Sequence, residues 1–177
     1  IGFHWLLPHP GLLRLFATAL RLYQRAGIRR LVRVTGLAKF LPSRLNGLDE
    51  NLPDLSGKFF VARDQRATPL RGNTRARVAL LSGCVMPLIH GQVMEAVMRV
   101  LVRSRIDVIV PAGQGCCGAL NLHAGERETA RTMARRNVNS FLDAGVDAVV
   151  VASAGCGSTM KEYDELLKDG LRRRRSR

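Results

Sequence analysis

Three short and almost entirely apolar runs alternate with helical segments in the second half of the chain, and this alternation constrains the fold most. The runs are RVALLSG at 77–83, DVIVP at 107–111 and DAVVVAS at 147–153. Apolar residues recur at helical spacing over the segments 90–104, 119–143 and 158–169. Strands without polar alternation are typical of parallel sheets covered on both faces by crossover helices. The pattern predicts an α/β fold, a small parallel sheet with crossover helices that is similar to half of a Rossmann fold.

The helix expected at 119–143 gives a further prediction about its two faces. Its spacing places Met133 and Phe141 inward, toward the sheet, and Arg127, Arg131 and Arg135 outward, toward solvent.

A basic stretch precedes this α/β part. Residues 1–48 contain eight Lys or Arg residues and no Asp or Glu. Apolar stripes predict two amphipathic helices, over 12–26 and 28–41, each needing a partner for its apolar face. Because 43–76 is rich in Pro, Gly and scattered charge, we expect a linker there. The predicted organisation is a basic helical segment at 1–42, the linker at 43–76, a cysteine-containing α/β domain at 77–170 and a basic tail at 171–177.

The net charge of +14 raises the question of nucleic-acid binding. Five arginines lie in the last six residues without interleaved aromatics, and aromatic content is only 5%. Base-stacking platforms are therefore scarce, and we expect no nucleic-acid partner. A solvated tail, an acidic partner or an anionic lipid surface explains the charge as well. No apolar run approaches the roughly 20 residues that span a bilayer, so we expect a cytoplasmic protein.

The four cysteines, Cys84, Cys116, Cys117 and Cys156, carry the strongest chemical signal. Each lies just past a predicted strand and at the start of the next helix. The carboxyl ends of parallel strands meet at one edge of a sheet, where ligands bind in open α/β folds. Four thiolates are enough for an iron–sulfur cluster or a zinc ion. The structural alternative is that these are small buried apolar side chains.

The stretch GQGCCGAL at 113–120 permits a second interpretation. Gly113, Gly115 and Gly118 spell the dinucleotide fingerprint G-x-G-x-x-G after a strand and before a helix. No acidic residue stands about 20 positions further on to bind a ribose hydroxyl. The glycines are better explained as room for the backbone around Cys116 and Cys117.

Several neighbouring residues have two candidate roles. Gln114 either donates hydrogen bonds to cluster sulfurs or stabilises a turn, and His123 is a further ligand, a proton carrier or a plain helix residue. His90 is expected to be a capping or surface group and Met94 core filler. Tyr163 belongs either to a partly packed first helical turn or to a partner interface. No Ser/His/Asp or paired-carboxylate constellation supports hydrolytic chemistry.

The arrangement of Cys84, Cys116-Cys117-Gly118 and Cys156 resembles the CCG cysteine-rich domain of heterodisulfide reductases and their relatives. Flanking segments sharpen the resemblance: SGCVMP at 82–87, Pro111 to His123 around CCGAL, Asn137, and AGCGSTMKEY at 154–163. They are similar to the first of two CCG domains in iron–sulfur subunits of glycolate oxidase. The helices expected at 12–41 resemble the segment that joins the ferredoxin-type domain of such subunits to the CCG pair.

The resemblance implies a non-catalytic electron-transfer subunit of a 2-hydroxy-acid-oxidising oxidoreductase. Cys84, Cys116, Cys117 and Cys156 would bind an iron–sulfur cluster of the 4Fe–4S type, with zinc as the alternative. The implied partners are a flavoprotein subunit and the rest of the iron–sulfur subunit, that is, its ferredoxin-type domain and second CCG domain. Electrons would pass toward a membrane quinone, and the resemblance allows peripheral association at the inner membrane face. Relatives in lactate use and anaerobic glycerol-3-phosphate oxidation share the domain.

Two departures from the family pattern matter. The full signature ends in C-x-x-C, and Thr159 stands where its last cysteine belongs, so a five-cysteine non-cubane cluster is not implied. The ferredoxin motifs and the second CCG domain are missing from these 177 residues, and the chain starts at Ile1, so we expect a piece of a longer protein. The competing hypothesis is a zinc- or thiol-stabilised α/β interaction module without a redox role.

Overall fold

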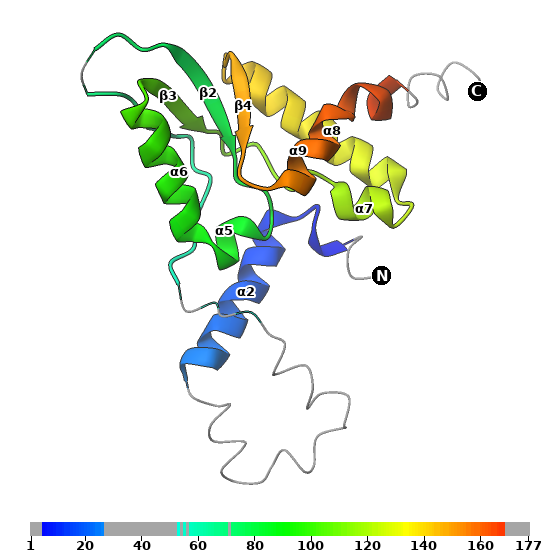
Figure 1. Cartoon of the computed structure of the whole chain (residues 1–177). Coiled ribbons are helices and arrows are strands. Elements are labelled where there is room, and N and C mark those ends of the chain that lie inside the picture. Colours follow the sequence, from blue (N-terminus) through cyan, green and yellow to red (C-terminus); the bar gives the residue numbers. More distant parts are fainter. Residues whose placement is uncertain (1–4, 27–52, 54, 56, 71, 169–177) are drawn as a thin grey trace, which may run out of the picture.

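The computed structural model describes residues 5–26, 53, 55, 57–70 and 72–168. The described strands form one sheet in the order β1-β3-β2-β4. They are β1 (Gln65–Ala67), β2 (Ala76–Leu81), β3 (Ile106–Val110) and β4 (Ala148–Val151). β2 lies between β3 and β4 (Figure 1) and pairs in parallel with both, whereas β1 pairs antiparallel with β3. The predicted α/β fold with parallel strands is confirmed, and β1 makes the sheet mixed.

The described residues contain six helices with defined bounds, which precede, connect or follow the strands (Figure 1). They are α2 (Pro10–Arg25), α5 (Met86–Ile89), α6 (Gly91–Arg103), α7 (Ala119–His123), α8 (Arg127–Asp143) and α9 (Ala154–Lys161). Residues 163–168 are also helical.

The alternation of side chains along β2 divides the core into two layers. Val78 and Leu80 pack with Met94 and its neighbours on α6. Ala79 and Leu81 face the other way and pack with Phe141 of α8 and with residues of α9. Successive strand residues point to opposite faces, so a strand with helices on both sides must be apolar throughout. This is why β2 lacks the polar alternation of a half-exposed strand.

The helix predicted over 119–143 is interrupted. Gly125 adopts φ +81° between α7 and α8, a conformation that ends a helix. The prediction that Arg131 faces solvent is wrong: its side chain is 2% exposed. Its Nε donates to the Leu166 carbonyl oxygen at 2.9 Å, and its guanidinium pairs with Glu128. The buried charge is therefore satisfied by a carbonyl and a carboxylate.

The linker expected at 43–76 needs correction in its second half. This part contributes the edge strand β1, and Leu55 and Phe60 are 4% and 7% exposed. Arg66 of β1 donates two hydrogen bonds to the buried carboxylate of Asp107 on β3. Because β1 has only three residues and no apolar run, periodicity gave no sign of it.

The amphipathic helix predicted at 12–26 is present as α2, and the second helix predicted at 28–41 lies outside the described residues. α2 begins with Pro10 at its first turn, where proline costs no hydrogen bond. Its predicted apolar stripe is exposed, with Leu15 and Phe16 at 67% and 61%, and the buried position is Ala17. The partner expected for this stripe stays a prediction. None of the helices in the described ranges is long and apolar enough to cross a membrane.

Candidate metal centre

The four cysteines lie at the carboxyl ends of the three parallel strands. Cys84 is in the turn between β2 and α5, and Cys116 and Cys117 are in the loop between β3 and α7. Cys156 is in the first turn of α9, just past β4. The placement follows from strand direction: three parallel strands bring their following loops to the same edge of the sheet.

All four cysteines line one cavity of about 220 Å³. Its other walls are mainly apolar and include Leu81, Met94 and Leu120. The Cys84 and Cys116 sulfurs are 3.2 Å apart, and all four cysteines are free thiols. The residues that the sequence singled out are thus brought together in space. That they bind a cofactor stays a prediction.

The thiols form a row. Cys84 interacts with Cys116, Cys116 with Cys117, and Cys117 with Cys156 through side-chain hydrogen bonds. No group of three or more His, Cys, Asp or Glu side chains in the described part of the chain has the arrangement that would hold a single metal ion. Four thiolates around one cavity do provide the donor set of a four-iron cluster, which is larger than a single ion.

The row of thiols separates their pKa values. The hydrogen bond with Cys116 lowers the pKa of Cys84 below its ordinary value. The hydrogen bond with Cys117 lowers the pKa of Cys116. The hydrogen bond with Cys84 and the burial of Cys116 have the opposite and larger effect, so the pKa of Cys116 is raised to about 12. Hydrogen bonds within the row, to Cys116 and Cys117 respectively, also raise the pKa values of Cys117 and Cys156. Cys84 is therefore the thiol that ionises first, and binding of a metal would release protons from the others.

A buried polar clamp fixes the loop that carries Cys116 and Cys117. Asn137 of α8 is fully buried; its Oδ1 accepts from the Gly115 N–H at 2.8 Å, and its Nδ2 donates to the Cys116 carbonyl at 3.0 Å. The Tyr163 hydroxyl donates to the Cys117 carbonyl at 2.8 Å and accepts from Asn137 Nδ2 at 3.2 Å. Burial raises the pKa of Tyr163, so it stays a neutral donor. Loop carbonyls that could not reach water are thereby satisfied.

Tyr163 begins the helical residues 163–168, as one of its two predicted settings has it, but its side chain is packed more fully than predicted. It is 6% exposed and its ring packs against Ala130 and Ala134 of α8. Sequence reasoning missed this role because Tyr163 and Cys117 are 46 residues apart. The sequence did offer one signal, a Tyr beside an apolar helix face. When such a Tyr is buried, its hydroxyl usually needs a hydrogen-bond partner.

Within the described residues, the Gln114 side chain bonds the end of β2 and makes no hydrogen bond to a thiol. Its Oε1 accepts from the Ser82 N–H at 2.7 Å, and its Nε2 donates to the Leu80 carbonyl at 3.0 Å. Of its two candidate roles, the structure supports the stabilising one. It ties the loop after β3 to the end of β2, which holds Cys84 and Cys116 in register.

Gly118 is the glycine that the cysteine loop needs most. It adopts φ +84° and caps α7, and a Cβ there would lie 3.3 Å from Ala130 Cα. Only glycine combines this conformation with so close an approach to α8. The chain therefore turns sharply after Cys117, and both adjacent thiols stay at the cavity.

The N-terminal segment covers the other side of the thiols. Leu7, 5% exposed, packs with Cys116 and Met133, and Leu13 of α2 joins this cluster beside Cys84. A second cavity of about 240 Å³ lies there, lined by residues of α2 and α5 together with Cys84 and Cys116. The segment before the α/β domain thus forms one wall of the cysteine site.

The other candidate residues lie partly outside and partly within the site. His123 and His90 are both exposed, His123 in the last turn of α7 and His90 at the N-cap of α6 without a side-chain cap bond. Thr159 is buried but does not line the cysteine cavity. Met94 is fully buried in the core, as predicted, and also lines the cavity. Ser153, whose hydrogen bond lowers the pKa of Cys156, was not predicted.

Comparison with known families matches two parts of the chain. Residues 78–161 match the cysteine-rich domain family CCG, and residues 1–52 match the family described as the linker region of the glycolate oxidase iron–sulfur subunit. The first match contains all four cysteines and the sheet edge that gathers them. The chain therefore contains a cysteine-rich domain of the CCG class.

Curated relatives are similar to this chain over different shares of its length. The "Probable glycolate oxidase iron-sulfur subunit" of Bacillus subtilis (strain 168) is 36% identical over 95% of this chain and 38% of its own length. The "Glycolate oxidase iron-sulfur subunit" of Escherichia coli (strain K12) is 36% identical over 57% of this chain and 25% of its own length. The "Lactate utilization protein A" of Shouchella clausii is 32% identical over 52% of this chain and 38% of its own length. No solved structure matches the chain at a significant level.

Taken together, the linker match and the cysteine-rich domain match make the chain similar to the iron–sulfur subunits of glycolate oxidase. The family resemblance predicted from the sequence is confirmed. The chain spans less than two fifths of the length of these relatives.

Proposed function

We propose that the chain is the iron–sulfur electron-transfer part of a complex that oxidises glycolate or a related 2-hydroxy acid. The observation that carries the proposal is that four thiols from three strand ends line one cavity. The names of the relatives as iron–sulfur subunits support it. A cluster bound there would take up and release single electrons.

In this proposal Cys84, Cys116, Cys117 and Cys156 ligate a cluster of the 4Fe–4S type. Asn137 and Tyr163 hold two of the ligands through their backbone carbonyls, and the apolar cavity walls limit water access. Outer contacts of this kind orient ligands and tune potential in metal sites. In this proposal burial and hydrogen bonding set the orientation of the cluster ligands and the reduction potential of the cluster, and the chain needs no catalytic side chain.

We also propose partners, which rest on the resemblance to iron–sulfur subunits of glycolate oxidase. A flavoprotein subunit would oxidise the hydroxy acid and pass its electrons to this chain, and the remaining domains of the iron–sulfur subunit would carry them toward a quinone. In this arrangement the complex lies in the cytoplasm, with peripheral contact at the inner face of the membrane. The chain itself would not bind the hydroxy acid.

Anaerobic reconstitution of the 177-residue chain with iron and sulfide tests the ligand set. We expect a charge-transfer absorbance and, after dithionite reduction, an EPR signal of a one-electron-reduced cluster. Each single Cys→Ala variant should lower the bound iron, whereas Ser158→Ala, at an exposed position on the helix of Cys156, should not. Stoichiometric zinc without iron would refute the electron-transfer function and favour the interaction module, which the threonine at position 159 also permits.

A second measurement tests the place in the complex. With the flavoprotein subunit and glycolate present, the reconstituted cluster should be reduced without dithionite. If dithionite reduces the cluster but glycolate with the flavoprotein does not, the proposed partner is refuted. The proposed metal site is not affected by that result.

A further inference from the structure

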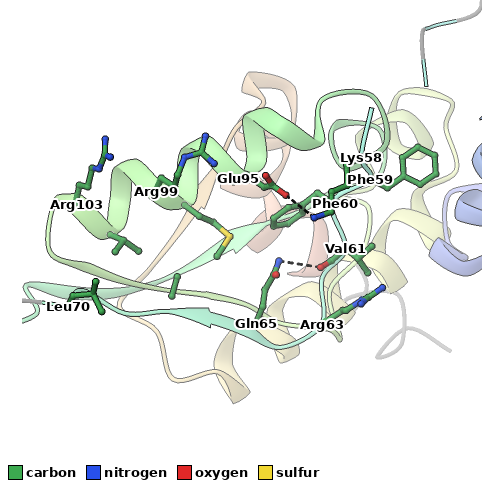
Figure 2. A pocket seen from close by; sticks show the side chains of 13 residues that line it. Lys58, Phe59, Phe60, Val61, Arg63, Gln65, Leu70, Glu95, Arg99 and Arg103 are labelled. Atoms are coloured by element: carbon green, nitrogen blue, oxygen red, sulfur yellow. Dashed lines mark hydrogen bonds and ion pairs between the residues drawn. The ribbon is translucent and has the colours of Figure 1, made fainter. Parts of the chain in front are cut away.

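A groove of about 660 Å³ lies between α6 and the edge strand β1 (Figure 2). Its apolar lining includes Phe60, Ala67, Met98 and Val102. Phe60 belongs to the buried core, and its N–H donates to the Pro87 carbonyl at 2.8 Å, so this wall is anchored. No residue that lines the groove also lines the cysteine cavity. The groove is thus a separate, preformed feature of a size typical of binding sites.

The rim of the groove is basic. Figure 2 shows Arg99 and Arg103 extending from α6, with Lys58 and Arg63 at the other end. All four are exposed. The acidic residue of the lining is Glu95, whose carboxylate lies 4.0 Å from Lys58 Nζ. The surroundings of the groove therefore carry an excess of positive charge, which attracts an acidic occupant.

The strand side of the groove offers an unused backbone edge. β1 is the outermost strand of the sheet, and no strand of the described ranges pairs with its outer side. Gln65 and Ala67 line the groove, whereas Arg66 points to the opposite face and pairs with Asp107. A strand added at this edge would place alternate side chains on the Gln65 and Ala67 face, that is, into the groove.

From these features we infer that the groove is a docking site for an extended acidic segment of a partner protein. The backbone of the segment pairs with β1, its alternate apolar side chains enter the groove, and its carboxylates face Arg99 and Arg103. Leu70, 98% exposed at the groove, adds an apolar contact that the chain alone leaves in water. A second copy of this chain is a poor occupant because each copy carries a net charge of +14.

The test uses the full 177-residue chain and a fluorescein-labelled peptide of about ten alternating valine and glutamate residues, long enough for one strand. Fluorescence anisotropy should show saturable binding that weakens with added salt. The double variant Arg99→Glu, Arg103→Glu should weaken binding about tenfold or more, since two attractions become repulsions. The matched control, Arg75→Glu with Lys161→Glu, changes two exposed residues outside the groove by the same charge and should change binding less than about twofold.

All four positions are exposed, so we expect both variants to keep the fold, and circular dichroism checks this. Four results would overturn the inference: no binding of the acidic peptide, equal binding of a valine–lysine peptide, an equal loss in the control variant, or self-association of the chain that the groove variant abolishes. The last result would assign the groove to a second copy. Peptide binding is independent of cluster loading, so failure of this test leaves the proposed electron-transfer function unaffected.

Discussion

The buried clamp at Asn137 gives the sharpest prediction about the cysteine loop. The variant Asn137→Ala removes the partner of the Gly115 N–H and of the Cys116 carbonyl, both inside the protein. Each unsatisfied buried group costs about 1–3 kcal/mol. The expected loss in the free energy of unfolding is therefore about 2–6 kcal/mol, a large part of the 5–15 kcal/mol that typically stabilises a domain.

Urea unfolding of the metal-free, reduced chain followed by circular dichroism measures this loss. The matched control is Asn139→Ala, because Asn139 lies on the same helix at an exposed position and should change stability by less than about 0.5 kcal/mol. The thiols should also react faster with an aromatic disulfide reagent in Asn137→Ala, since the loop that carries Cys116 loses its anchor. Equal stability and equal thiol reactivity in the two variants would refute the role of the clamp.

A milder variant covers the case in which Asn137→Ala does not fold. Tyr163→Phe removes only the hydroxyl that donates to the Cys117 carbonyl, and about 1–2 kcal/mol should be lost. Full retention of stability in Tyr163→Phe would show that water or another donor replaces the hydroxyl.

Three further predictions concern the surroundings of the site. Leu7→Ala should cost about 2–3 kcal/mol in urea unfolding and Leu15→Ala, which is 67% exposed, less than about 0.5 kcal/mol; equal costs would contradict the packing of the N-terminal segment. Gly118→Ala should cost more than Gly125→Ala by about 1 kcal/mol or more, because both have positive φ but only the first meets a neighbour within 4 Å. The hydrogen bond from Arg66 lowers the pKa of Asp107 from 3.8 to about 2, so the carboxylate contributes about 2 kcal/mol above about pH 4, and this contribution is lost as pH falls toward 2. The free energy of unfolding should therefore fall less between about pH 4 and pH 2 in Asp107→Asn than in the unchanged chain. An identical pH dependence in the two proteins would refute the assignment.

The sequence predicted the parts of the fold that depend on long apolar patterns. The three parallel strands and their order of connection followed from apolar runs of four to six residues separated by amphipathic helices. Strand direction alone then placed Cys84 and Cys156 at the same edge, although 71 residues separate them. Features that rest on tertiary contacts could not be found in this way.

Arg131 illustrates the limit. Helical spacing placed it outward, but a carbonyl of a later helical turn and the Glu128 carboxylate allow the guanidinium to be buried. β1 was missed because its pairing energy comes from β3 and from Asp107, neither of which is visible in the local pattern around Arg66. The clamp formed by Asn137 and Tyr163 has the same origin, since its partners are backbone atoms of a distant loop.

The cover formed by Leu7 and Leu13 has a consequence for how the protein is divided. Family comparison assigns residues 1–52 to a linker and begins the cysteine-rich domain at Val78. Yet Leu7 and Leu13 contribute to the same apolar cluster as Cys116, and Gln24 of α2 bonds the backbone at Pro53 and Leu55. Leu7 and Leu13 thus cover the thiols from this side, and a displacement of α2 would change how readily water and oxidants reach them.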